Sequence, residues 1–161
     1  MNRNSNFMKM HKLYIISILL IFLSSCCAGQ NNTSEKRTEN MLLEFYTKHF
    51  QVWKIPALPS DVRYKKLDSL MQMYCTLKLR NKARETYENV GADLLTNDLI
   101  GNLNENLKVE KDTTNENGFI VSFITDIATY KDTPGVPTNK RIILHVTVIE
   151  EGENYKIDDV K

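Results

Sequence analysis

The sequence predicts an α+β fold in which helices pack on one face of a curved antiparallel sheet. In residues 39–90 the apolar side chains recur at steps of three and four, which is typical of helices with one buried face. From residue 107 onward the apolar period is two, which is typical of strands with one buried face. Because the helices come first and the strands follow, an α+β arrangement is favoured over alternating βαβ units.

Three helices are expected, and the first covers Glu39–Trp53. It ends at Ile55–Pro59, because each proline there disfavours helix in the residue before it. Ser60 is the expected N-cap of the second helix, and Asp61 lies in its first turn, where a negative charge is favourable. The third helical run is expected to stop at Gly91, since glycine readily adopts the conformation that ends a helix.

The expected strands share alternating apolar residues and are Leu107–Lys111, Phe119–Thr125, Arg141–Glu150 and Tyr155–Val160. Asn117-Gly118 is a hairpin signal before the second of them, and Glu151–Asn154 predicts a turn before the last. The segment Lys131–Lys140 contains two prolines and a glycine, so it is expected to be a loop. Together these features predict an antiparallel meander.

The N-terminal segment has the pattern of a signal peptide. Met1–Lys12 carries positive charge and no acid, and Leu13–Leu23 is almost wholly apolar. At a rise of about 1.5 Å per residue, this apolar run reaches about 16 Å, roughly half the thickness of a hydrocarbon core. A permanent membrane span is therefore not expected. Translation from Met8 or Met10 instead of Met1 would leave a basic segment in place.

The four residues Leu23-Ser24-Ser25-Cys26 resemble the bacterial lipobox, in which small residues precede a cysteine that receives a lipid and becomes the new N-terminus. The resemblance implies that Cys26 is acylated and holds the protein on the lipid bilayer. The expected layout is a signal peptide in residues 1–25, the lipidated cysteine and a flexible tether in residues 26–38, and one domain in residues 39–161. The alternative is an uncleaved anchor that happens to end in cysteine.

Charge excludes one class of partner and bears on location. Once the three basic residues of the signal segment are removed, 18 basic and 20 acidic side chains remain, a net charge near −2. A nucleic-acid binder would show a clear excess of lysine and arginine, so none is expected. No acidic run follows Cys26 of the kind that directs some lipoproteins to the cell surface. We therefore expect the periplasmic face of the outer membrane.

The segment Asp93–Asp98 is the most function-like stretch of the domain. Its carboxylates and Asn97 lie between the predicted helices and sheet, where they would bind a cation or polarise a substrate. The alternative is that they cap a helix or a turn by bonding nearby backbone. With Asp126 and His145 as further ionisable groups, the candidate ligand pocket consists of Asp93, Asn97, Asp98, Asp126 and His145.

Other candidate chemistry has a plainer interpretation. A histidine such as His145 is a general base at neutral pH if it faces a pocket, and a surface residue if it faces solvent. His49 lies beside the apolar stripe of the first helix and is expected at the surface. Cys75 is expected in the core, where free cysteines are common. The chain has no phosphate-binding loop and no metal-ligand or nucleophile motif, so no cofactor, metal or catalytic residue is predicted.

Basic residues are concentrated in residues 63–84, which contain seven basic side chains and one acid. The basic residues are Arg63, Lys65, Lys66, Lys78, Arg80, Lys82 and Arg84. Such a surface either guides a charged partner or anionic lipid, or is a solvated face with local ion pairs.

A set of short motifs resembles a known family. They are Phe45-Tyr46, Tyr74-Cys75-Thr76, Gly91–Leu95, Asn97-Asp98 and Tyr155–Val160. Over residues 40–161 they are similar to an uncharacterised family of small exported bacterial lipoproteins with a cystatin-like, nuclear-transport-factor-2-like fold. The resemblance implies a cone in which helices close one side of a bent sheet. It implies no activity, because that fold carries many functions.

Three functional hypotheses follow. The preferred one is a non-catalytic, membrane-anchored periplasmic lipoprotein whose domain binds a partner protein or a small ligand. The first alternative is a small enzyme of the cyclase or isomerase type, which needs an ionisable group such as His145 or Asp126 in the cavity of the cone. The second alternative is an immunity lipoprotein that inhibits a secreted toxin.

Overall fold

The computed structural model describes residues 33–96, 102–103, 106–127 and 138–161, and the side chains at 102–103, 126–127 and 138–139 are not described. The chain separates into two compact units, Met1–Arg37 and Thr38–Lys161. The second unit contains all the packing that follows. Its helices lie on an antiparallel sheet, which confirms the predicted α+β class and order of elements.

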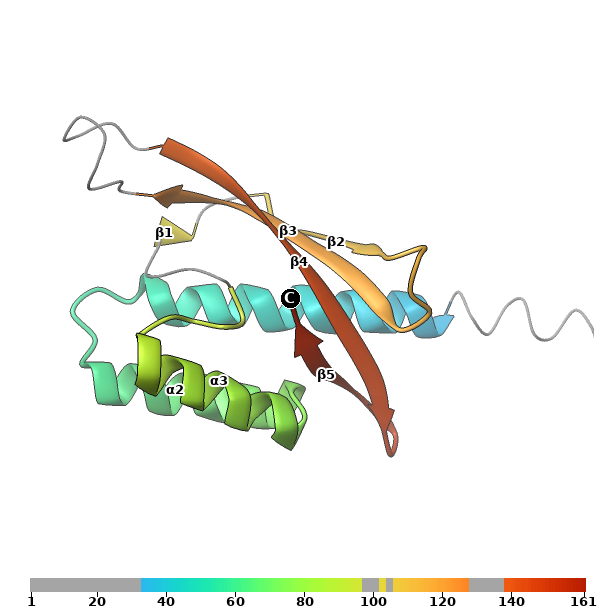
Figure 1. Ribbon diagram of the computed structural model, residues 1–161, viewed down its shortest axis with the longest axis horizontal. Coiled ribbons are helices and arrows are strands. Elements are labelled where there is room, and N and C mark those ends of the chain that lie inside the picture. The colour runs from blue at the N-terminus through green and yellow to red at the C-terminus, as the bar shows by residue number, and fades with distance from the viewer. Residues whose placement is uncertain (1–32, 97–101, 104–105, 128–137) are drawn as a thin grey trace, which may run out of the picture. The chain divides into compact units, whose positions relative to one another are not determined.

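Three helices precede the sheet (Figure 1). The first covers residues 33–54, α2 is Ser60–Tyr74 and α3 is Leu77–Val90. The first helix begins six residues earlier than predicted and includes residues 33–38, which the composition had assigned to the tether. Glycine and proline are both missing from residues 33–54, and Thr38 is already buried, so the helix continues without a break.

The helix ends agree with the sequence in part. Ser60 was predicted to be the N-cap of α2 but is its first residue, because Pro59 occupies the cap position and no side chain caps this helix. Thr76 caps α3 by accepting a hydrogen bond from the backbone N–H of Leu79. Gly91 ends α3 as predicted, in the left-handed region at φ +70°.

The sheet is antiparallel throughout and contains β1 (Asn102–Leu103), β2 (Lys108–Lys111), β3 (Gly118–Ile127), β4 (Thr138–Glu151) and β5 (Asn154–Val160). Its order is β1-β3-β4-β5, and β2 pairs with the same strand as β1. β1 was not predicted. β4 begins within the segment predicted as a loop, whose residues 131–137 lie outside the described residues.

The hairpin between β2 and β3 was predicted from Asn117-Gly118. Its glycine is required by close packing in the loop and not by a positive φ. Gly118 does not have a positive φ. A Cβ at this position would lie 2.7 Å from the Cβ of Asn115, so the loop packs too closely for any other residue. The ammonium group of Lys111 closes the same loop by donating to the carbonyl oxygens of Asn115, Glu116 and Gly118 at 2.6–2.9 Å.

β5 contains an irregularity that reorients one side chain. Thr147 pairs with Asp159 but Val148 pairs with Ile157, so Asp158 is an extra residue in β5. The bulge lets Ile157 and Val160 both face the core, and it directs Asp158 toward the start of α3. The backbone at Cys75 also pairs with Ile157, where Thr76 N–H donates to the Ile157 carbonyl oxygen at 2.9 Å.

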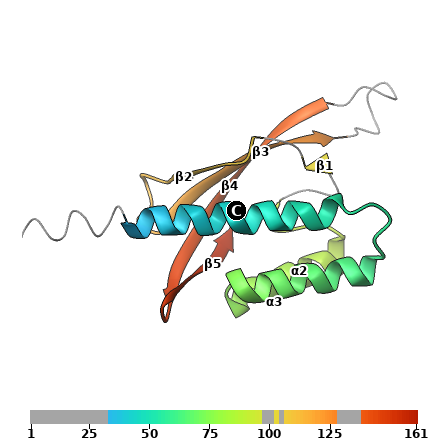
Figure 2. The same ribbon diagram turned by 180° about the vertical axis from the view of Figure 1, so that it is seen from behind.

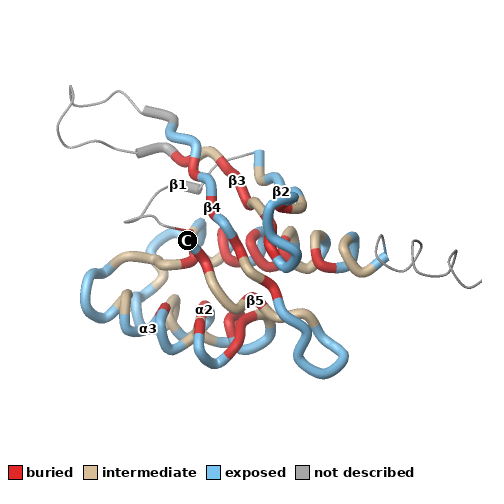
Figure 3. The backbone as a smooth tube through the Cα atoms, turned by 45° about the vertical axis from the view of Figure 1, so that its right-hand side comes forward, coloured by how far each residue is buried: buried red, intermediate tan, exposed pale blue. Residues whose placement is uncertain are grey.

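One face of the sheet and the helices enclose the core (Figures 2 and 3). The buried core side chains of β3 and β4 follow the period of two that is typical of strands. The first helix adds a row of buried apolar side chains along one of its faces. The fully buried members include Leu42, Phe45, Tyr46, Leu79, Val121, Phe123, Leu144 and Ile157. The opposite face of β4 is open, with Ile143 55% exposed.

Candidate functional site

A polar cluster of His49, Trp53 and Asp93 lies at the end of the first helix. His49 Nε2 is 3.1 Å from Asp93 Oδ2, and the indole N–H of Trp53 donates to the same oxygen at 3.1 Å. The other oxygen of Asp93 accepts the backbone N–H of Leu95 at 3.0 Å. His49 and Trp53 are four residues apart, so they lie on one face of the helix and reach the same carboxylate.

The environment of Asp93 favours its charged form. Burial on its own would raise the pKa of this carboxyl, because charge is costly away from water. The positive charge and hydrogen bond of His49 oppose that effect, together with the bonds from Leu95 and Trp53, and the pKa of Asp93 lies below its ordinary value. Asp93 therefore acts as an anionic acceptor that joins the first helix to the segment after α3.

A small, partly open cavity adjoins this cluster. Its volume is about 20 Å³, and His49 and Asp93 line it together with apolar and aromatic residues from the helices. A cavity of that size has room for a water molecule and not for an organic substrate. His49 is only 1% exposed, so the pair has the geometry of a structural contact.

The prediction that His49 is a surface residue is therefore wrong. The position follows Phe45 and Tyr46 by four and three residues and belongs to the same helical face. That spacing was a usable signal, but the polarity of histidine obscured it. The alternative interpretation of Asp93, as a residue that fixes a turn, agrees with its bond to the Leu95 N–H.

Of the five residues predicted to form a ligand pocket, the structure describes the side chains of Asp93 and His145, and these two contact different partners. His145 is on the face of β4 opposite the core residues Leu144 and Val146, and 61% of its side chain is exposed. Its nearest acid is Asp112, at 3.6 Å. His145 therefore faces solvent, which agrees with the surface alternative and not with a general base in the cavity of the cone.

The other predicted pocket residues add little. Asn97 and Asp98 lie outside the described residues. Asp126 is part of β3, where its backbone is opposite Asn102 and Asn139, and its side chain is not described. Among the described residues, no group of three or more His, Cys, Asp or Glu side chains is arranged to hold a metal ion.

Cys75 is a core residue, as predicted. It is 3% exposed, and burial raises the pKa of its thiol to about 12. A nucleophilic cysteine needs a lowered pKa, so this thiol is chemically inert at neutral pH.

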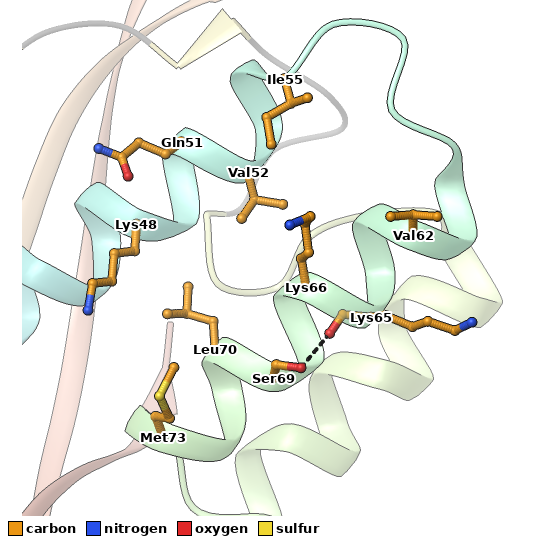
Figure 4. A pocket seen from close by; sticks show the side chains of 10 residues that line it. All are labelled: Lys48, Gln51, Val52, Ile55, Val62, Lys65, Lys66, Ser69, Leu70 and Met73. Atoms are coloured by element: carbon orange, nitrogen blue, oxygen red, sulfur yellow. Dashed lines mark hydrogen bonds between the residues drawn. The ribbon is translucent and has the colours of Figure 1, made fainter.

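A large surface depression lies between the first helix and α2, and we call it the helix-hairpin groove (Figure 4). Its volume is about 590 Å³. The lining residues come from both helices and are Lys48, Gln51, Val52, Ile55, Val62, Lys65, Lys66, Ser69, Leu70 and Met73. The basic residues are visible in the sequence but the groove is not, because the groove depends on how two helices pack.

The described part of the chain contains no helix with the length and hydropathy needed to cross a bilayer. A solved structure of a protein of unknown function from Bacteroides thetaiotaomicron has a similar fold, with a TM-score of 0.66. The match covers 83% of this chain and 95% of that chain, at 20% identity, and at that identity it shows the fold alone. No family model matches this chain, and no curated protein matches it.

Proposed function

We propose that this protein is an exported lipoprotein, held on the periplasmic face of the outer membrane by a lipid on Cys26, whose domain binds a partner and does not catalyse a reaction. One observation carries the proposal: an eleven-residue apolar run ends directly at Leu23-Ser24-Ser25-Cys26. Acyl chains on that cysteine would anchor the chain firmly, because each buried CH₂ contributes about 0.8 kcal/mol.

The use of the ionisable groups supports a binding role. His49 and Asp93 are occupied with each other beside a cavity too small for a substrate. His145 faces solvent, and the thiol of Cys75 stays protonated. The helix-hairpin groove, in contrast, is open and within the size range of ligand sites.

The anchor is tested by replacing each of two adjacent cysteines. We expect the wild-type protein and Cys27→Ser to take up labelled palmitate and to fractionate with membranes. Cys26→Ser should take up no label and should accumulate as the longer precursor, because the lipid and the cleavage site are lost together. Labelling of Cys26→Ser, or none in the wild-type protein, would refute the anchor.

A further inference from the structure

The basic residues of 63–84 divide into two groups in the structure. Arg63 donates to the carbonyl oxygens of Trp53, Ile55 and Leu58 and lies over the Trp53 ring. Four others form ion pairs with acids: Lys78 with Asp158, Lys82 with Asp159, and Arg80 and Arg84 with Asp68. The positive charges of these five residues are therefore already bonded or balanced within the domain.

The remaining two, Lys65 and Lys66, line the helix-hairpin groove. Their ammonium groups make no hydrogen bond or ion pair with any described residue. The third lysine of the groove, Lys48, is already bonded to Glu44 at 2.6 Å and to the Tyr74 hydroxyl at 3.1 Å. The unbalanced positive charge beside the groove therefore comes from Lys66, whose side chain points toward the first helix, and from Lys65 at the rim, whose side chain extends away from it (Figure 4).

The floor of the groove is apolar. Val52 and Leu70 point toward one another from the two helices (Figure 4), and Met73 and Ile55 keep 59% and 38% of their surfaces exposed. The lining positions recur at helical spacing on each helix, at 48, 51, 52 and 55 and at 62, 65, 66, 69, 70 and 73. From Val62 to Met73 the groove follows α2 for about 16 Å, which is about three helical turns.

We infer that this groove receives an amphipathic helix of a partner protein, with an apolar stripe and acidic residues beside it. This inference rests on the proposed binding function and gives it a site. The apolar stripe would cover Val52, Met73 and Ile55, and the acidic residues would pair with Lys65 and Lys66. A third helix between two packed helices is a common mode of peptide recognition, with anchors at i, i+3, i+4 and i+7.

A lipid surface fits the groove less well, although it also offers negative charge. The apolar side chains lie between two helices, so a flat bilayer that meets the lysines does not reach Val52 or Leu70. A helix can lie along the groove with its axis about 8–10 Å from each lining helix, which is the usual packing distance. Charge and shape together select the protein partner.

The test uses the full-length lipidated protein in nanodiscs of zwitterionic lipid and a fluorescent 18-residue peptide with leucines at i, i+3, i+4 and i+7 and glutamates beside them. We expect saturable binding after the signal of empty nanodiscs is subtracted. Lys65→Glu/Lys66→Glu should weaken binding at least about tenfold, because two attractions become repulsions. Met73→Ser should weaken it several-fold, and this exposed site tolerates the change.

Lys108→Glu/Lys140→Glu is the matched control, since it makes the same charge change on exposed strand residues outside the groove, and it should leave binding unchanged. Equal loss with this control, equal binding of a scrambled peptide, or no saturable binding up to about 1 mM would overturn the inference. The inference would also be overturned if vesicles with anionic lipid bound through Lys65 and Lys66 while the peptide did not bind. Palmitate on Cys26 is measured in the same sample, so failure of the groove is distinguished from failure of the anchor.

Discussion

At the scale of single residues, the Asp93 carboxylate joins its own turn to side chains that are 40 or more positions earlier in the chain. It accepts from two side chains of the first helix, His49 and Trp53, and from its own turn at Leu95. Hydrogen bonds to a charged acceptor contribute about 1.5–3 kcal/mol, and buried donors that lose their acceptor cost further free energy. The cluster therefore holds the end of the first helix against the segment that follows α3.

Asp93→Ala should lower the free energy of unfolding by about 3 kcal/mol, because it leaves the donors of His49, Trp53 and Leu95 without their acceptor. Circular dichroism during urea unfolding of the chain from residue 28 onward measures the change. Asp61→Ala is the control: Asp61 is exposed in the first turn of α2, so its loss should cost less than about 1 kcal/mol. Equal costs for the two variants would contradict the structural role of Asp93.

The lowered pKa of Asp93 predicts how stability depends on pH. As pH falls, the unfolded chain binds a proton at this carboxyl near pH 4, and the folded chain binds it only at a lower pH. The stability that the charged carboxylate contributes is therefore complete above about pH 4 and is lost as pH drops through the folded pKa. Asp93→Asn removes this part of the dependence. The difference in unfolding free energy between wild type and Asp93→Asn should shrink from pH 6 to pH 3, and a constant difference would refute the assignment.

The candidate residues show what the sequence can predict at this scale. The burial of Cys75 followed from its helical surroundings, which are local. His145 was left with two alternatives because the alternation of β4 separates two faces without saying which one the helices cover. The pairing of His49 with Asp93 joins residues 44 positions apart, and no local pattern predicts such a contact.

At the scale of elements, the bulge in β5 and the start of α3 form one unit. Thr76 accepts the Leu79 N–H and donates to Asp158 Oδ1 at 3.0 Å, and Lys78 donates to the other oxygen at 2.6 Å. The hydrogen bond from Lys78 is the largest cause of the lowered pKa of Asp158. A negative charge beside the first turn of α3 also complements the helix dipole.

Asp158→Ala should cost about 1–2 kcal/mol of stability, because it removes a half-buried acceptor from the cap of α3. Lys78→Ala removes the exposed partner of the same carboxylate and should cost less than about 1 kcal/mol. Thermal unfolding of the two variants measures both values. In a double-mutant cycle, Thr76→Val and Asp158→Ala should be non-additive, and simple additivity would show that the two side chains act independently.

The elements were predictable where their signals are local. Helix periodicity, the prolines at 56 and 59 and Gly91 placed α2 and α3 to within a few residues. The extended break at Cys75 depends on pairing with Ile157, which is 82 residues away, and the bulge at Asp158 depends on where α3 lies. Both are tertiary features, so local propensity did not reveal them.

At the scale of the whole molecule, the proposed anchor and the described domain have separate tasks. The proposed lipid on Cys26 sets the location, and the compact unit of residues 38–161 presents the helix-hairpin groove. The fold class followed from composition and period alone, and the groove did not, since its lining depends on the packing of two helices. The proposed anchor depends on the segment before the domain, where Leu23-Ser24-Ser25-Cys26 resembles a lipidation signal.

The proposed lipid on Cys26 is tested most directly by the intact mass of the protein purified from the cell envelope. We expect a chain that begins at Cys26 and carries the added mass of its acyl chains. A chain that still contains residues 1–25, or one cleaved elsewhere with no lipid, would refute the lipid anchor on Cys26.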